Sequence, residues 1–503
     1  MRLIQWRSMV LRNSRILLGS FMGGLLCGAL HAEETTDRTA AIAGAEGSIA
    51  ARGGFPVEQD DKRPAEQRTV QIFNRPLTIG GELDFALDWE LDPALDTSAE
   101  DDRLTGEELV ALEFLYKWSE HTLLFVETEV FYESTWFRDN NHDHVSALGL
   151  SRKQHWIFLQ QLAGTPFSLQ IGRQNIAEKR EWWWDTELDG VRLYYELGAV
   201  HAEVMLAEEM GAENTVAGFE ARGRDVRRVL GRIRWQWAMR HRVEIFLLDQ
   251  HDHSRQEILG QVIDQSREDE NDSDLTWFGL RQSGSFKIPS TGSFYYWADT
   301  AIVNGDEIRY DYEDADAATS VVAGVRRQDI RGWAIDTGIT WDTNLPNTPT
   351  LTLALAVGSG DDSPNDGGSH AFIQTGLNDN NGNFRGVDRF RYYGEFLRPE
   401  LSNLAVSTVS LGAPFLDNSS IELVYHGYRQ LHATHFLRDA KVDATPSGRD
   451  ADIGDEIDLV IGIEESEHYE FEFVAGVFRA GEAFDQAEGN MAGTVQFKLN
   501  YNF

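Results

Sequence analysis

The chain has 503 residues and a formal net charge of −37, from 45 Lys and Arg residues against 82 Asp and Glu residues. This balance argues against nucleic-acid binding, which requires a basic surface. The single cysteine, Cys27, excludes a disulfide framework.

Residues 1–32 have the pattern of a secretory signal peptide, with a positive leader, an apolar core over residues 16–30 and a tolerable cleavage site at residues 30–32. A retained membrane anchor is one alternative, but the apolar run is short for a membrane span. Lipidation of Cys27 is a second alternative, although the large Leu26 precedes it. We expect the segment to be removed, which leaves a mature chain without cysteine.

Residues 33–76 show no hydrophobic periodicity and combine several glycines with mixed charges. This composition is typical of a flexible segment, here expected in the periplasm before the first strand. The remaining residues, 77–503, are expected to form one domain.

Strict alternation of apolar and polar residues marks both ends of this domain. Leu77–Asp92 reads L-T-I-G-G-E-L-D-F-A-L-D-W-E-L-D, and Thr494–Phe503 reads T-V-Q-F-K-L-N-Y-N-F. Each therefore predicts a strand with one apolar face and one polar face. A strand of a transmembrane barrel has this pattern because one face meets lipid and the other meets water. A soluble sandwich is the alternative, but we expect these two strands to pair and close a barrel.

Similar strand patterns recur between these ends, and no convincing amphipathic helix interrupts them. The predicted connections alternate in length: short at 119–121, 198–199, 239–241 and 465–468, and long at 135–151, 209–225, 251–273, 304–328, 359–401 and 431–455. Short turns on one rim and long loops on the other are typical of outer-membrane barrels. The sequence thus predicts an all-β fold, a transmembrane antiparallel outer-membrane β-barrel of about 18 strands around an aqueous channel.

Motifs for catalysis, cofactors and metals are weak. The sequence has no G-x-S-x-G, H-E-x-x-H or phosphate-binding loop, and its paired acids suit a polar lumen as well as glycosidase chemistry. His142 and His144 are better explained as loop residues than as metal ligands. The Asp- and Asn-rich segments 359–362 and 378–382 leave calcium open as an alternative, although their spacing does not match a helix-loop-helix site. We therefore expect no enzyme activity, no cofactor and no metal.

Cations on faces assigned to the lumen, or on an inward-folding loop, are the candidate functional residues. They are Lys153, Arg173, Arg192, Arg232, Arg234, Arg389, Arg391 and Arg398. Arginine binds carboxylates with two parallel hydrogen bonds, so a series of arginines would pass a polyanion from one guanidinium to the next. The alternative is that these cations pair with lumen acids such as Glu113, Glu127 and Asp185 to stabilise the wall.

Four stretches carry a family resemblance: 171–174 (I-G-R-Q) with 184–186 (W-D-T), 374–377 (Q-T-G-L) with 394–404 (G-E-F-L-R-P-E-L-S-N-L), 423–426 (L-V-Y-H), and 452–460 (D-I-G-D-E-I-D-L-V) with 476–484 (G-V-F-R-A-G-E-A-F). Over residues 77–503 the chain resembles the alginate export porins of Gram-negative outer membranes. The resemblance implies an 18-stranded barrel through which alginate, a polyuronate, diffuses past an arginine-lined constriction. It matches Arg173, Arg389 and Arg398 to that constriction, with Lys153 in place of an arginine and Asp185 as a nearby acid.

The chain also departs from the family pattern. Glu113 stands where the resemblance implies an arginine, Thr78 where it implies a lysine, and Arg232 where it implies an acid. Glu472 and Val474 occupy a region that is basic in the family. The turn at 465–468 is short, whereas the type member has a long loop there that can plug the pore.

The sequence supports three hypotheses. The first is an outer-membrane channel for passive export of an anionic polysaccharide such as alginate, with that polymer, outer-membrane lipid and periplasmic secretion components as candidate partners. The second is an uptake porin for small oligosaccharides or organic acids, favoured by the acidic lumen positions and the short turn. The third is an outer-membrane enzyme, for which the sequence offers no clustered catalytic group.

Overall fold

The computed structural model describes residues 67–96, 102–137, 144–208, 210–211, 214–216, 226–254, 257–264, 271–315, 319–362 and 367–503. The expected signal peptide (1–32), most of the segment 33–76 and His142 lie outside the described residues. Among those described, no helix is long and apolar enough to cross a membrane.

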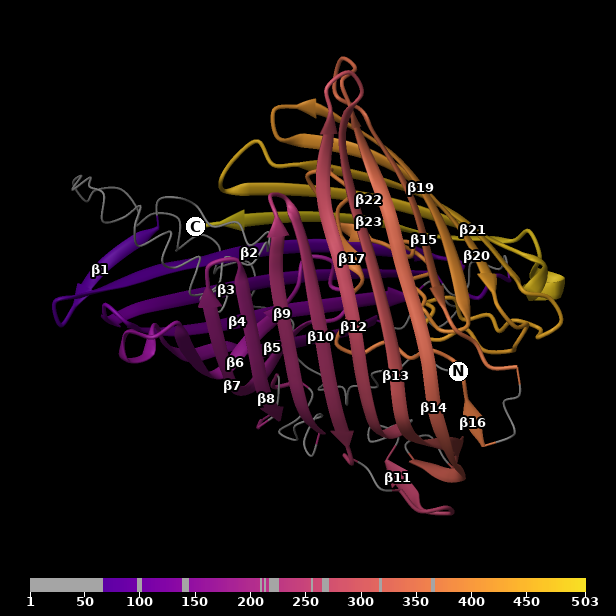
Figure 1. Ribbon diagram of the computed structural model, residues 1–503. Helices are drawn as coiled ribbons and strands as arrows, with labels where there is room; N and C mark the ends of the chain where they lie inside the picture. The colour runs from indigo at the N-terminus through magenta and orange to yellow at the C-terminus, as the bar shows by residue number, and fades with distance from the viewer. Residues whose placement is uncertain are drawn as a thin grey trace.

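Eighteen antiparallel strands close into a barrel (Figure 1). The first nine are β2 (Arg75–Leu91), β3 (Arg103–Ser119), β4 (Thr122–Phe137), β5 (His144–Leu159), β6 (Phe167–Ala177), β7 (Asp185–Leu197), β8 (Val200–Glu208), β9 (Val226–Ala238) and β10 (His241–Asp252). The other nine are β12 (Asn271–Ile288), β13 (Gly292–Asp314), β14 (Thr319–Thr343), β15 (Thr350–Gly358), β19 (Leu404–Leu416), β20 (Ser419–Gln430), β21 (Asp452–Ile463), β22 (Tyr469–Ala480) and β23 (Met491–Asn502). The predicted fold class and strand number are confirmed.

The barrel closes where the sequence predicts. β2 pairs with β23 from Glu82 opposite Asn502 to Leu91 opposite Gly493, and the C-terminus lies beside β2 (Figure 1). Phe503 exchanges two backbone hydrogen bonds of 3.0 Å with Gly81. These pairings leave no free edge along this seam, which matters in lipid because an unpaired backbone group there costs several kcal/mol.

The short elements extend the barrel or lie between its strands. β1 (Arg68–Ile72) forms a hairpin with β2, so this part of segment 33–76 is ordered. β11 (Val262–Asp264) and β16 (Gly368–Ser369) pair with β14, and β17 (Asn381–Gly382) pairs with β18 (Phe390–Arg391). Two 3₁₀ helices, η1 (Leu162–Gly164) and η3 (Glu482–Ala487), lie in connections.

The outer face of the barrel is apolar. Exposed residues at alternate strand positions include Leu83, Trp89, Val110, Val191, Leu247, Ile335, Leu423 and Val477. Exposed aromatic residues stand beside the short turns, as Trp118, Trp237 and Tyr469 do. An apolar band with aromatic residues at its edge is the surface that a bilayer requires. Acids such as Glu244, Asp299 and Glu456 are buried on the inside.

Two predicted connections are wrong. β4 reaches Phe137 and β5 begins at His144, so strands cover most of the long loop expected at 135–151. The sequence pattern indicated a long loop at 304–328, but β13 and β14 continue through most of it, pairing from Asn304 opposite Arg331 to Asp314 opposite Ser320. Charged residues such as Glu307, Arg309 and Arg327 mask the strand pattern there. This extension lies toward the long-loop rim, where polar residues on both faces of a hairpin are tolerated.

Two connections fold into the barrel and supply part of its core. The "tryptophan loop" (residues 178–184) joins β6 to β7, and the "inner loop" (residues 359–403) joins β15 to β19. Trp183 of the first and Phe372 of the second are almost fully buried, and they belong to one cluster with wall residues such as Trp277. The barrel interior is therefore a packed, charged core rather than an open tube on this side.

Candidate functional site

A ladder of charges runs across the inner face of the barrel wall. Residues of opposite charge stand directly opposite each other on consecutive strands, in the pairs Glu203–Arg232, Arg234–Glu244, Glu244–Arg281 and Arg281–Asp299. Cross-strand pairs of opposite charge stabilise a sheet. The ladder therefore both orients these side chains and supports the wall from β8 to β13.

Arg232 and Arg234, two predicted pathway residues, belong to this ladder, and a third, Arg192 of β7, contacts its first acid. Arg192 lies 2.6 Å from Glu203, Arg232 lies 2.9 Å from the same carboxylate, and Arg234 lies 3.3 Å from Glu244. Arg192 and Arg232 are buried. Removing one partner of a buried pair costs about 3–5 kcal/mol, because the other charge is left without compensation. For these three residues the structure favours the wall-stabilising interpretation, although their partners differ from the acids that the sequence suggested.

Glu178 organises the tryptophan loop. Its carboxylate accepts backbone N–H bonds from Arg180 (3.0 Å), Trp182 (2.7 Å) and Trp183 (3.1 Å), and both of its oxygens accept hydrogen bonds from Arg281. Burial opposes ionisation, but these donors lower the pKa of Glu178 to about 2. The carboxylate is thus ionised and ties the loop to the wall.

Arg180 and Trp183 attach the same loop to the wall by packing. The Arg180 guanidinium lies between the rings of Trp297 (4.4 Å) and Tyr392 (4.3 Å) and 2.8 Å from Asp336. Trp183 stacks on Phe246 with ring centroids 4.8 Å apart. Cation–π contacts gain strength when desolvated, as they are here. The loop is held by charge and by aromatic packing together.

The inner loop is fastened to the tryptophan loop and to distant strands. Thr375 donates to the carbonyl of Trp183 (2.5 Å), and Trp277 of β12 donates to the carbonyl of Ile373 (2.8 Å). The backbone N–H of Phe396 donates to Glu456 of β21 (2.6 Å). Because β12 and β21 lie on separate parts of the wall, the inner loop crosses the interior of the barrel.

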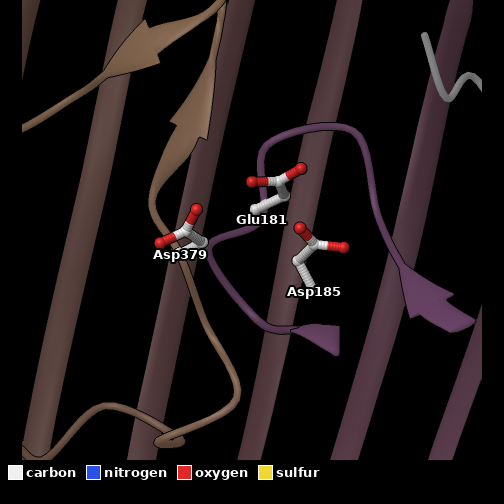
Figure 2. Close-up of side chains that lie close together, drawn as sticks. All are labelled: Glu181, Asp185 and Asp379. Carbon is white, nitrogen blue, oxygen red and sulfur yellow. The ribbon is translucent and has the colours of Figure 1, made fainter. Parts of the chain in front are cut away.

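Three acids meet where the two loops and β7 converge. Figure 2 shows Glu181, Asp185 and Asp379 close together, and one carboxylate oxygen of each lies within 4.8 Å of the others. Arg389 donates to Glu181, and Arg391 donates to Asp379. Guanidinium groups thus compensate Glu181 and Asp379, and Asp379 lies in the segment 378–382 where the sequence left calcium open.

Lys153 and Arg173 meet on the same side of the barrel. Arg173 lies 3.2 Å from Glu187 of β7, and Lys153 lies 3.9 Å from Glu187 and 3.5 Å from Glu129. Glu187 follows Asp185 by two residues, so β7 connects this pair to the acids around Arg389 and Arg391. We call Lys153, Arg173, Arg389 and Arg391, with their acid partners, the "β7 cluster".

Arg398 lies further along the inner loop. It has φ 46°, and its side chain bonds to the carbonyl of Glu395 (2.6 Å). Burial and the nearby positive charge of Arg391 lower the pKa of Arg398. The structure therefore divides the predicted set into three parts. Five residues converge around β7: Lys153, Arg173, Asp185, Arg389 and Arg391. Arg398 lies near Arg391, and Arg192, Arg232 and Arg234 form part of the wall.

Sequence reasoning missed the residues that anchor the two loops. Glu178, Arg180 and Arg281 do not stand in any motif with a recognisable spacing. The available signal was the segment 178–185, E-K-R-E-W-W-W-D, in which three consecutive tryptophans adjoin charges of both signs. Such a segment is too apolar for a solvated loop and too charged for a lipid-facing strand.

Comparisons with known proteins agree with this architecture. Residues 75–497 match the model of the alginate export family, described as "Alginate export". "Alginate production protein AlgE" of Pseudomonas aeruginosa is 26% identical over 316 residues, and that of Azotobacter vinelandii is 24% identical over 308 residues. These matches span 62% and 58% of this chain and 63% and 61% of the relatives, less than two thirds of their length.

Two solved structures have chain traces that partly match this one. The Pseudomonas aeruginosa protein OccK5 (OpdH) has a TM-score of 0.49 at 10% identity, covering 84% of this chain and 98% of that one. Acinetobacter baumannii OccAB4 has a TM-score of 0.48 at 11% identity, covering 87% and 99%. The family match over residues 75–497 shows that this chain, a closed 18-stranded barrel of the outer membrane, belongs to the alginate export family.

Proposed function

We propose that this protein is a channel, not an enzyme, through which an anionic polysaccharide crosses the outer membrane passively. Alginate or a related polyuronate is the expected substrate. The observation that carries the proposal is the β7 cluster, where Arg389 and Arg391 bind Glu181 and Asp379, whose carboxylates lie within 4.8 Å of that of Asp185 of β7 inside a closed barrel. Membership in the alginate export family and the names of the similar proteins support it.

The pairing of these arginines suggests how a polyanion would pass. Arg389 and Arg391 have partly exposed side chains and already hold carboxylates, those of Glu181 and Asp379. A uronate carboxylate has the same geometry, so it exchanges with a protein carboxylate at the same guanidinium. Passage through a channel requires binding that is strong enough for entry and weak enough for release. Competition from protein acids keeps the binding of each sugar weak.

The acidic part of the wall favours a second candidate, a pore for small solutes. Glu107 stands directly opposite Glu133, and Glu113 stands opposite Glu127. Like charges directly opposite each other destabilise a sheet. Their presence on β3 and β4 would be explained if a hydrated, cation-attracting path runs along this side of the lumen.

Planar-bilayer recording of the purified protein distinguishes the two candidates. The reversal potential is measured under a salt gradient, and polyuronate is then added to one chamber. The export proposal expects anion selectivity and block by polyuronate. Cation selectivity without block, together with permeation of neutral oligosaccharides into proteoliposomes, would favour the small-solute pore.

A further inference from the structure

A second charged site lies inside the barrel near the short turns. It is a cavity of about 440 Å³, within the range of about 300–1,000 Å³ that is usual for small-molecule sites. Arg240 and His241 beside the β9–β10 turn contribute to its wall, as does Tyr295 beside the β12–β13 turn. Lys179 and Arg385 reach it from the tryptophan loop and the inner loop. We call it the basic pocket.

The lining of the basic pocket is positive although the whole chain is strongly negative. The residues that line it include Lys179, Arg180, Arg234, Arg240, Arg242, Arg281 and Arg385. No Asp or Glu of the described residues is among them. In a chain with a net charge of −37, such a segregated set of cations marks a place where negative charge is attracted.

The cations of the pocket fall into two groups. Arg180 and Arg281 are buried and hold acids behind the pocket wall, as shown above, and Arg234 and Arg242 both pair with Glu244. Lys179, Arg240 and Arg385 are exposed, and in the part of the chain that the structure describes no carboxylate lies within ion-pair distance of them. Their charge is therefore available to a ligand, unlike that of Arg389 and Arg391, which already hold carboxylates.

Aromatic side chains stand beside these free cations. The Arg385 guanidinium lies 4.2 Å above the ring of Tyr295, and the Arg180 guanidinium lies 4.4 Å above the ring of Trp297. An aromatic face offers a flat apolar surface with a negative quadrupole. The rings therefore hold the guanidinium groups in place, and a sugar acid carries the carboxylate that matches the free cations.

We infer that the basic pocket is a binding subsite for uronate sugars on the side from which the polymer enters, an inference that rests on the proposed function. The short turns of an outer-membrane barrel face the periplasm. A polymer that leaves the periplasm therefore meets this pocket near its point of entry. The free cations of the pocket capture the chain there.

The test compares block of the reconstituted full chain by short oligomannuronates added from either side of a planar bilayer. Glu120→Cys, in the β3–β4 turn of a mature chain expected to have no other cysteine, marks the turn side for an impermeant thiol reagent. The test variant is Lys179→Gln/Arg240→Gln/Arg385→Gln. The control is Arg326→Gln/Arg327→Gln/Arg449→Gln, which removes the same charge from exposed residues toward the long-loop rim.

The inference expects the test variant to raise the half-blocking concentration from the turn side by about tenfold or more, as loss of charge-assisted contacts implies. The control should change it less than about twofold, and neutral maltooligosaccharides should not block. If the wild type is blocked and the test variant matches it, the pocket inference is wrong and the proposed function stands. If oligomannuronates block the wild type from neither side, the proposed function itself fails.

Discussion

Arg281 of β12 donates to both carboxylate oxygens of Glu178, and this pair joins the barrel wall to the tryptophan loop. The same Arg281 lies 2.6 Å from Asp299 of β13. The wall ladder and the inward-folded loops are therefore one electrostatic network. Its residues position the β7 cluster and the floor of the basic pocket.

Glu178→Gln should destabilise the protein. The substitution leaves Arg281 with less negative charge around it in a buried site, and breaking such a pair costs about 3–5 kcal/mol. The temperature at which the folded barrel loses its fast gel mobility should fall accordingly. Glu465→Gln, in the exposed β21–β22 turn, is the control and should leave that temperature unchanged. Equal behaviour of the two variants would contradict the anchoring role of Glu178.

Acid should loosen the tryptophan loop over a defined range of pH. The pKa of Glu178 is about 2 in the folded protein, below its ordinary value of 4.5. A depressed pKa gives stability that is complete above the unfolded value and is lost as pH falls through the folded value. The near-UV circular dichroism of the buried tryptophans should therefore hold above about pH 4.5 and decline toward pH 2. Glu178→Gln should lack this contribution, so a decline identical to that of the wild type would assign the transition to other groups.

Arg389→Gln/Arg391→Gln should reduce selectivity for anions. The two substitutions leave Glu181 and Asp379 without their guanidinium partners, so the acid cluster gains net negative charge. The reversal potential should shift toward that of a cation-selective pore, and block by polyuronate should weaken by about tenfold or more. Arg326→Gln/Arg327→Gln at the far end of β14 serves as the charge-matched control. An unchanged reversal potential would remove the β7 cluster from the pathway.

Glu181→Gln should have the opposite effect. Glu181 is almost fully buried, and its side chain pairs with the partly exposed Arg389. Neutralising it leaves the guanidinium free to bind a mobile anion, while the Glu181 carbonyl still accepts the N–H bonds of Asp379 and Asn380. Polyuronate should then block at lower concentration and dissociate more slowly in single-channel records. Faster dissociation than in the wild type would show that Glu181 does not compete with the polymer.

Gly279→Ala should destabilise the packing of the tryptophan loop. A Cβ at Gly279 would lie 2.0 Å from the ring of Trp183 and 2.6 Å from the carbonyl oxygen of Thr300. Overpacking of this kind costs about 1–3 kcal/mol. Gly427→Ala on β20 is a matched control, because the nearest atom to its Cβ would be 3.5 Å away. Thermal unfolding of the two variants measures the difference, and equal midpoints would contradict the close contact.

The sequence by itself determined the barrel. Alternation over Leu77–Asp92 and Thr494–Phe503 was sufficient to predict closure, because lipid on one side and water on the other act on every residue of a spanning strand. The same rule failed at 304–328, where the strands leave the membrane and both faces are wet. Local periodicity therefore identifies strands only where a bilayer imposes it.

Tertiary structure decided which cations share a site. Arg173 and Arg389 are 216 positions apart; Arg173 pairs with Glu187 of β7, and Arg389 pairs with Glu181 beside Asp185 of β7 only because the inner loop crosses the barrel. From sequence alone, Arg192 and Arg389 are both candidate pathway residues. In the structure, Arg192 pairs with Glu203 of the wall, whereas Arg389 pairs with Glu181 of the tryptophan loop. The basic pocket combines residues of two loops and several strands. Charge alone does not distinguish such cases, because the role of an arginine depends on which carboxylate the fold places beside it.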